Sequence, residues 1–500
     1  MRRSLLPALA LTLLAVLLMP TAPAAARTSG IDWKPCDQDA TAECGTLTVP
    51  IDWATPGSGT IDLALARRKA TDATKRIGSL VVNPGGPGVS GVDFALFSDR
   101  FLSAELTKSF DIVGFDPRGV GRSHPVVCSS ALLRAMPPTL MRSQADFEAR
   151  VAYNKRLRED CEARTGPLFD HVSTVSVVRD LEAIRAALNE ERMTFYGVSY
   201  GTLIGQQYAE RYPGRVRALV LDSNFDHSLG TGAYLDTAAI NAESAFDEFA
   251  DWCAKNATCP LHGKDVRAFW AKLLARADRG ELHQPGQPDI PLTSWDLIDQ
   301  AFGAFYGPYW TELAESLLAT DTAAAAKTPS GEASQAEELS PFPRAVFCQD
   351  FSFPVRDYRE YAARLDRQRA LAPDMRYNPA ALYAIAACLD WPTPIPNPQH
   401  RLNVDGTPPI LVANALYDPA TSYLWAAGVA GQIGREAALL TYEGWGHGVY
   451  GRSDCVTGAM DRYLISLTVP TAAGSRCPAI PPPAVGLNRS PSGVQQFLVE

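Results

Sequence analysis

The 500-residue sequence lacks any cluster of basic residues: 46 Lys and Arg are dispersed among 55 Asp and Glu, giving a net charge of −9. Phosphate binding needs clustered Lys and Arg, so nucleic acid is not an expected partner. The sequence also lacks internal repeats and, after its N-terminal segment, any apolar run long enough to cross a membrane. It has no pair of Cys-x-x-Cys units and no His-x-x-x-His unit, so nothing in it supports a zinc site. No other metal and no organic cofactor is implied.

The first residues have the organisation of a secretory signal peptide. A basic start is followed by an apolar run from Leu5 to Met19 and by small residues ending at Ala26. The alternative is a membrane anchor, which the short run and Pro7 disfavour. We therefore expect residues 1–26 to be removed and the mature protein to be secreted, with association with the cell envelope left open.

An even number of cysteines in an exported chain favours disulfides over metal ligands. Pairing between neighbours is expected because short loops close at small entropic cost. The expected pairs are Cys36 with Cys44, Cys128 with Cys161, Cys253 with Cys259, Cys348 with Cys388, and Cys455 with Cys477.

Short apolar runs bounded by Gly, Pro and Asp recur along the chain, as in a parallel sheet that is buried on both faces. Amphipathic helical patterns, such as the one over residues 178–188, separate several of these runs. Strands alternating with helices predict an α/β fold with a mostly parallel central sheet. The apolar runs lie at 78–88, 110–123, 193–202, 216–226, 408–421 and 437–448.

The alternation stops between about residues 226 and 402, where Trp, Phe, Ala and charged helical patterns are frequent. This segment is predicted to be a mainly helical lid inserted into the sheet domain. Residues 321–339 inside it are small and polar and predict a mobile loop. The expected organisation is a signal peptide (1–26), an N-terminal core (27–225), the lid (226–402), a C-terminal core (403–477) and an extended tail (478–500).

"GVSYG" places Ser199 between an apolar strand and a helical pattern. That context is typical of a nucleophile elbow, in which a strained turn exposes the serine hydroxyl. Glycine is expected on both sides because side chains there would collide with neighbouring backbone. Ser199 is therefore the predicted nucleophile.

The base and the acid of a catalytic triad are expected later in the chain, in the order Ser, acid, His. His447 follows the final apolar strand between two glycines, and Asp418 ends the penultimate strand. His447 would accept the serine proton, and Asp418 would orient the imidazole. Thr421 could hydrogen-bond near the triad or cap the next helix.

Two backbone N–H groups should form the oxyanion site. One is expected from Tyr200, the residue after the nucleophile. The other is expected from the glycine loop "NPGGPG", at Gly86, with Gly85 as the next choice. "DPRG" (residues 116–119) is interpreted as a structural brace, in which an Arg–Asp pair pins the end of a strand.

"NPGGPG" resembles the His-Gly-Gly-Pro-Gly motif of prolyl aminopeptidases, with Asn83 and Pro84 ahead of the glycines. Together with "GFDPRGVGRS", "GVSYGT", "YDPAT" and "GWGHG", it resembles the secreted bacterial tripeptidyl aminopeptidases of the α/β-hydrolase fold, including their C-terminal region. The resemblance extends over most of the mature chain. It implies a serine exopeptidase that releases short peptides, of tripeptidyl or prolyl type, through an acyl-enzyme.

An aminopeptidase needs a carboxylate for the protonated α-amine of its substrate. The candidates are Asp350, Asp226 and Glu243. Relatives of this kind include esterases, so a carboxylesterase for small or lipid esters is the alternative. A non-catalytic envelope binding protein is less consistent with a complete triad.

Overall fold

The computed structural model describes residues 30–284, 287–322, 338–470 and 475–482. The predicted signal peptide, most of the predicted tail and residues 323–337 of the predicted loop lie outside these ranges. Within the described residues, none of the helices combines the length and the apolar character that crossing a membrane requires.

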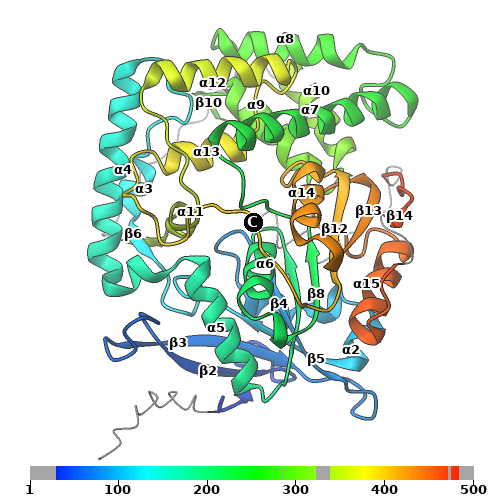
Figure 1. Cartoon of the computed structure of the whole chain (residues 1–500). Coiled ribbons are helices and arrows are strands. Elements are labelled where there is room, and N and C mark those ends of the chain that lie inside the picture. The colour runs from blue at the N-terminus through cyan, green and yellow to red at the C-terminus, as the bar shows by residue number, and fades with distance from the viewer. Residues whose placement is uncertain (1–29, 285–286, 323–337, 471–474, 483–500) are drawn as a thin grey trace, which may run out of the picture.

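The largest element of the structure is one ten-stranded sheet. In chain order its strands are β1 (Lys34–Pro35), β2 (Glu43–Pro50), β3 (Thr60–Arg68), β4 (Gly78–Asn83), β5 (Phe110–Phe115), β7 (Met193–Val198), β8 (Val216–Asp222), β12 (Ile410–Tyr417), β13 (Ala437–Trp445) and β14 (Ser475–Cys477). Across the sheet they lie in the order β1-β2-β3-β5-β4-β7-β8-β12-β13-β14 (Figure 1). All pairs from β5 to β14 are parallel, whereas β1, β2 and β3 extend one edge as antiparallel strands. The predicted mostly parallel sheet is therefore confirmed.

The central strands are apolar because both faces of the sheet are covered. Every residue of β4, β5 and β7 is buried. Alternate side chains of a strand point to opposite faces, so Leu80 and Val82 belong to one hydrophobic core and Val81 to the other.

Helices pack on both faces of the sheet. The first face is covered by α1 (Gly91–Leu96), α2 (Ala104–Ser109) and α15 (Asp454–Ser466), and the second by α5 (Thr174–Ala187), α6 (Gly201–Arg211) and α14 (Tyr423–Ile433). Short 3-10 helices cover Ser98–Arg100, Gly166–His171, Pro213–Arg215 and Gly434–Glu436.

The chain between β8 and β12 is mainly helical, as the sequence predicts. In Figure 1 its long helices form a separate layer at one end of the molecule, above the sheet. Its elements are α7 (Thr231–Lys255), α8 (Val266–Asp278), β9 (His283–Gln284), β10 (Gln287–Pro291), α9 (Ser294–Phe305), α10 (Trp310–Thr322), β11 (Leu339–Pro341), α11 (Arg344–Asp350), α12 (Tyr358–Leu371) and α13 (Pro379–Ala387). We refer to residues 226–402 as the insert.

A second helical segment joins the insert from the N-terminal half of the chain. It comprises β6 (Val127–Ser129), α3 (Ser130–Arg134) and α4 (Gln144–Thr165). Strand β6 pairs with β11 of the insert, and the Asn154 amide of α4 donates to the carbonyl of Ala386 at 2.9 Å. The long helix α4 therefore stands against the insert (Figure 1), which the strand pattern of the sequence did not indicate.

All ten cysteines form disulfides, each with the neighbour that the sequence analysis assigned to it. Cys36–Cys44 and Cys455–Cys477 lie at the two ends of the sheet. Cys128–Cys161 joins β6 to α4. Cys253–Cys259 and Cys348–Cys388 lie in the insert.

The "DPRG" loop after β5 is a brace, but its arginine pairs outside the motif. Arg118 is fully buried and donates twice to Asp180 of α5, at 2.6 Å from both Nε and Nη2. Asp116 instead accepts hydrogen bonds from the Val92 N–H at 3.1 Å and the Arg122 N–H at 2.8 Å. The two charged residues of the motif therefore hold different helices against the sheet.

Candidate active site

Ser199 lies in the tight turn between β7 and α6. Its φ is +57°, a left-handed conformation that residues other than glycine rarely adopt. A Cβ atom on Gly197 would come within 2.5 Å of the Gly201 carbonyl oxygen, and one on Gly201 within 2.6 Å of the Asn83 carbonyl oxygen. The close backbone packing therefore requires both glycines, and the turn has the geometry of a nucleophile elbow.

The glycine loop after β4 lies against the residue that follows Ser199. Gly85 has a φ of +92°, and a Cβ atom there would be 2.7 Å from the Tyr200 nitrogen. Gly86 lines the same cavity as Ser199. Among the described residues, neither the Gly86 N–H nor the Tyr200 N–H has a protein acceptor. Two unused backbone donors beside a serine hydroxyl are what an oxyanion site requires.

Asp418 and His447 form a buried hydrogen-bonded pair. The parallel register of β12 and β13 brings the loops after both strands to the same edge of the sheet. His447 Nδ1 lies 2.9 Å from Asp418 Oδ2 and 3.0 Å from Oδ1. An Nδ1–H that donates to the carboxylate leaves Nε2 of the neutral ring as a proton acceptor. A neutral ring in this orientation therefore presents Nε2 as a general base requires.

The Asp418 carboxylate is held by further donors from its own loop. Oδ1 accepts the N–H groups of Ala420 and Thr421, each at 2.9 Å, and Oδ2 accepts the Thr421 hydroxyl at 2.9 Å. Thr421 Oγ1 is also 3.3 Å from His447 Nδ1. Ser422, and not Thr421, caps α14. Of the two roles that the sequence left open for Thr421, the structure places it beside the acid and the histidine.

The insert positions the histidine loop. The His447 N–H donates to the carbonyl of Tyr306, which ends α9, at 2.9 Å. The Tyr306 ring meets the imidazole edge-on, with ring centres 5.2 Å apart. Ser199 Oγ and His447 do not form a hydrogen bond in the described structure. Catalytic hydrogen bonds are often long before substrate binds and shorten in the complex.

Two residues at the end of β8 connect the serine turn to the histidine loop, and the sequence analysis did not single them out. The Ser199 N–H donates to the Asp222 carbonyl at 2.9 Å. The Gly448 N–H donates to the Ser223 hydroxyl at 2.8 Å, and the Val449 N–H to Asp222 Oδ1 at 2.9 Å. Burial raises the pKa of Asp222. In the sequence, the available sign of this role was that Asp222 is an acid at the end of a buried parallel strand.

Asparagines of the insert hold the loop that carries the acid. Asn241 of α7 donates to the Asp418 carbonyl, and Asn378 before α13 donates to the Pro419 carbonyl at 3.2 Å. The insert therefore contacts the loops of both Asp418 and His447, so the geometry of the pair depends on how the insert packs.

Ser199 opens into a cavity of about 110 Å³ between the sheet and the insert. Aromatic and small side chains make up most of its wall, polar atoms supply most of its accessible surface, and Arg344 is the charged residue in it. No carboxylate of the described residues lines this cavity. The lining residues are Gly86, Pro87, Ser199, Phe225, Tyr234, Tyr306, Arg344, Phe347, Asn378, Ala380, Ala381, Ala384 and Ala420.

Asp350 lies behind the serine turn and not in the cavity. Its carboxylate accepts the Thr174 N–H at 2.8 Å, the Tyr200 hydroxyl at 2.6 Å and the Asn397 amide at 2.8 Å. Burial raises its pKa to about 6. These contacts make Asp350 a support for Tyr200.

The other two candidate carboxylates are also engaged by protein donors. Asp226 accepts the Ser228 N–H at 2.9 Å and the Gln432 amide at 3.0 Å. Glu243 accepts the Met375 N–H at 2.9 Å. The structure does not bring the three candidates together, and none of them lines the cavity at Ser199.

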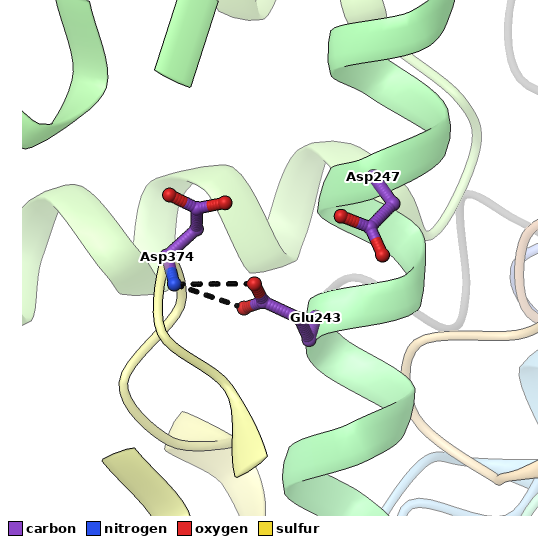
Figure 2. Close-up of side chains that lie close together, drawn as sticks. All are labelled: Glu243, Asp247 and Asp374. Atoms are coloured by element: carbon purple, nitrogen blue, oxygen red, sulfur yellow. Dashed lines mark hydrogen bonds between the residues drawn. The ribbon is translucent and has the colours of Figure 1, made fainter. Parts of the chain in front are cut away.

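Glu243 belongs to an acidic cluster with Asp247 and Asp374, in which one carboxylate oxygen of each residue lies within 4.8 Å of the other two. Figure 2 shows Glu243 and Asp247 on one helix, facing the loop that carries Asp374. Burial raises the pKa of Glu243 to about 7. Arg267 pairs with Asp247 at 2.6 Å and also with Asp374. A guanidinium therefore already supplies positive charge to this cluster, and we assign no metal to it.

Comparisons with known proteins identify the family of the chain. The family model described as alpha/beta hydrolase fold matches residues 78–451. Serine protease Hip1 of Mycobacterium tuberculosis is 34% identical over 486 residues, covering 89% of this chain and 91% of the relative. Tripeptidyl aminopeptidase of Streptomyces lividans is 32% identical over 475 residues, covering 89% and 86%. Carboxylesterase B of Mycobacterium tuberculosis is 32% identical over 451 residues, covering 86% and 85%.

Proposed function

The chain belongs to the alpha/beta hydrolase fold family and is a serine hydrolase, and we propose that it is an aminopeptidase that releases short peptides from free N-termini. The observation that carries the proposal is the site itself. Ser199 stands in a strained turn beside two unused backbone N–H groups, and His447 is hydrogen-bonded to the buried Asp418. The likeness to relatives named as a serine protease and a tripeptidyl aminopeptidase supports peptides as substrates.

In the proposed first step, Ser199 Oγ attacks the carbonyl carbon of the scissile peptide bond. His447 Nε2 accepts the hydroxyl proton, and Asp418 stabilises the imidazolium through Nδ1. The Gly86 and Tyr200 N–H groups bind the oxygen that becomes negative in the tetrahedral intermediate.

Collapse of the intermediate breaks the C–N bond, and His447 gives its proton to the leaving amine. The released N-terminal peptide remains esterified to Ser199. In the second half-reaction His447 takes a proton from water, the hydroxide attacks the ester carbonyl, and the proton returns to Ser199.

The insert acts as a lid in this proposal. It supplies Tyr306, Arg344, Phe347 and Asn378 to the cavity wall, and its helices contact the Asp418 loop. A small cavity closed by the insert suits the end of a peptide better than a long chain that enters and leaves on both sides.

No carboxylate of the described residues lines the cavity at Ser199, where the substrate would bind. Asp350, Asp226 and Glu243 remain candidates by charge, but each carboxylate already accepts protein hydrogen bonds. The peptide proposal thus rests on the relatives more than on these acids.

We also propose that the protein acts outside the cytoplasm. The protein has five disulfides, and disulfides form and persist in oxidising compartments and are rare in the cytosol. The N-terminal segment that predicts a signal peptide lies outside the described residues.

The first test compares one tripeptide p-nitroanilide with its N-terminus free and acetylated, with Ser199→Ala as the blank. We expect the free amine to be preferred by at least about tenfold in kcat/KM, a difference of about 1.4 kcal/mol, because a desolvated ammonium needs a specific partner. Equal or faster turnover of the acetylated peptide would exclude the exopeptidase proposal. Release of the complete tripeptide, seen by mass spectrometry, would distinguish tripeptidyl from single-residue removal.

A carboxylesterase is the second candidate, because no carboxylate of the described residues lines the cavity at Ser199 and one relative is named Carboxylesterase B. Cleavage of p-nitrophenyl butyrate without cleavage of any tripeptide anilide would support the esterase and leave the Ser199 mechanism intact.

A further inference from the structure

Arg344 stands at the start of α11 and lines the cavity into which Ser199 opens. It is the charged residue of that wall. Within the described part of the chain its guanidinium makes no ion pair, although most arginines of the insert are paired with acids. Its recorded partner is the Tyr383 ring, 4.7 Å from the guanidinium carbon. A half-buried cation without an acid is costly unless something else neutralises it.

The charge of Arg344 reaches the other polar groups of the cavity. Burial raises the pKa of Tyr234 and of Tyr306, and the positive charge of Arg344 acts on both in the opposite direction. Tyr306 also contacts His447. Arg344 therefore shares the cavity wall with the tyrosine that contacts the catalytic histidine.

The cavity belongs to the acyl side of the scissile bond. Ser199, which receives the acyl group, and Gly86, which faces the acyl oxygen in the proposed mechanism, both line it. His447, which would protonate the leaving amine, does not. In the proposed mechanism, the side chain of the residue whose carbonyl is attacked is therefore the group that would occupy the cavity.

Small side chains make up part of the cavity wall. Ala380, Ala381 and Ala384 of α13 and Ala420 of the acid loop line the same space of about 110 Å³ as Arg344, and no acid of the described residues lines it. A side chain that ends in a carboxylate would fill this space and pair with the guanidinium in the bidentate geometry that arginine favours.

We propose that Arg344 makes the enzyme selective for substrates whose acyl residue carries a carboxylate, so that it releases peptides ending in glutamate or aspartate. This specificity rests on the proposed aminopeptidase function. The positive charge of Arg344 does not oppose the positive charge of the substrate N-terminus in this proposal. In a tripeptide, the α-amine lies two residues away from the side chain that meets Arg344.

The test measures kcat/KM for Ala-Ala-Glu and Ala-Ala-Gln p-nitroanilides, which differ at the cleaved residue by charge and not by size. A charge-assisted hydrogen bond contributes about 1.5–3 kcal/mol, so the glutamate substrate should be preferred by about 10- to 100-fold. High salt should reduce the preference, because the interaction is electrostatic. A glutamate-to-glutamine ratio near one in the wild type overturns the proposal.

Arg344→Met keeps the aliphatic stem over Tyr383 and removes the charge. The ratio of kcat/KM for the glutamate substrate to kcat/KM for the glutamine substrate should fall to near one, because the interaction specific to the carboxylate is lost. Arg344→Lys should retain part of the preference. Arg359→Met is the matched control: it removes an exposed positive charge of the insert that is not in the cavity, and should leave the ratio unchanged. A full glutamate preference in Arg344→Met overturns the assignment.

The role of Arg344 can also be tested if the aminopeptidase proposal fails and no tripeptide anilide is cleaved. The rate of hydrolysis of the p-nitrophenyl monoester of glutarate, whose acyl group ends in a carboxylate, is then compared with that of p-nitrophenyl valerate, whose acyl group is uncharged. A preference for the glutarate ester that is lost in Arg344→Met supports the anion site in an esterase. Equal turnover of the two esters rejects it.

Discussion

Replacing Thr421 with valine would remove one hydroxyl group from the buried Asp418–His447 pair at almost constant volume. The hydroxyl donates to Asp418 Oδ2 at 2.9 Å and lies 3.3 Å from His447 Nδ1. Thr421 and Asp418 are both completely buried, so water cannot take the place of the lost donor. The variant should therefore allow the carboxylate to rotate away from the orientation that holds the imidazole.

A hydrogen bond to a charged group contributes about 1.5–3 kcal/mol. If all of it acts on the transition state, in which His447 is positively charged, the rate falls by about tenfold for every 1.4 kcal/mol. We expect kcat for the best substrate to fall by about 10- to 100-fold, with little change in KM, because the hydroxyl does not line the substrate cavity.

The assay is steady-state hydrolysis of a tripeptide anilide or, if esters are the substrates, of p-nitrophenyl butyrate. Thr421→Ser keeps the hydroxyl and serves as the control, with activity near that of the wild type. A thermal unfolding curve for each variant separates loss of catalysis from loss of folding. The reasoning is refuted if Thr421→Val keeps wild-type kcat, or if serine and valine at this position lower kcat equally.

Three further predictions test other parts of the structure. Burial raises the pKa of Glu243 from 4.5 to about 7, so the folded state binds this proton more tightly than the unfolded state does. The free energy of unfolding should therefore fall by up to about 3 kcal/mol as the pH rises from about 4.5 to 7. Urea unfolding of Glu243→Gln should lack this dependence on pH, and identical pH profiles for the variant and the wild type would contradict the prediction. Arg118→Met leaves the buried Asp180 without its partner and should cost about 3–5 kcal/mol of stability, much of which replacing Asp180 with leucine as well should restore. Gly85→Ala brings a methyl group within 2.7 Å of the Tyr200 nitrogen and should lower kcat by about 100-fold or more with the protein still folded, whereas unchanged kcat would argue against an oxyanion role for this loop.

The parallel sheet and the positions of Ser199, Asp418 and His447 could be predicted because their signals are local. Ser199 and Asp418 directly follow apolar strands and His447 lies two residues after one, and the carboxyl ends of parallel strands meet at one edge of a sheet. The glycines beside Ser199 could be interpreted in the same way, since a turn with a left-handed residue leaves little space for neighbouring side chains. The cysteine pairs were also accessible, because neighbouring cysteines close short loops.

Contacts between distant segments could not be predicted in this way. The sequence analysis placed the partner of Arg118 inside the "DPRG" motif, but the partner is Asp180, 62 residues away. The acids considered for the substrate amine illustrate the same point: charge alone suggested Asp350, whereas its surroundings make it a support for Tyr200.

The sequence by itself determined the sheet and the order of the site residues along it, because strand, turn and glycine requirements act over a few neighbouring residues. The tertiary structure decided that Asp222 ties the serine turn to the histidine loop and that Arg344 enters the cavity at Ser199. The first arrangement depends on how the loops after β7, β8 and β13 meet at one edge of the sheet, and the second depends on how the insert packs against the sheet. In both cases the residues that meet lie far apart in the chain.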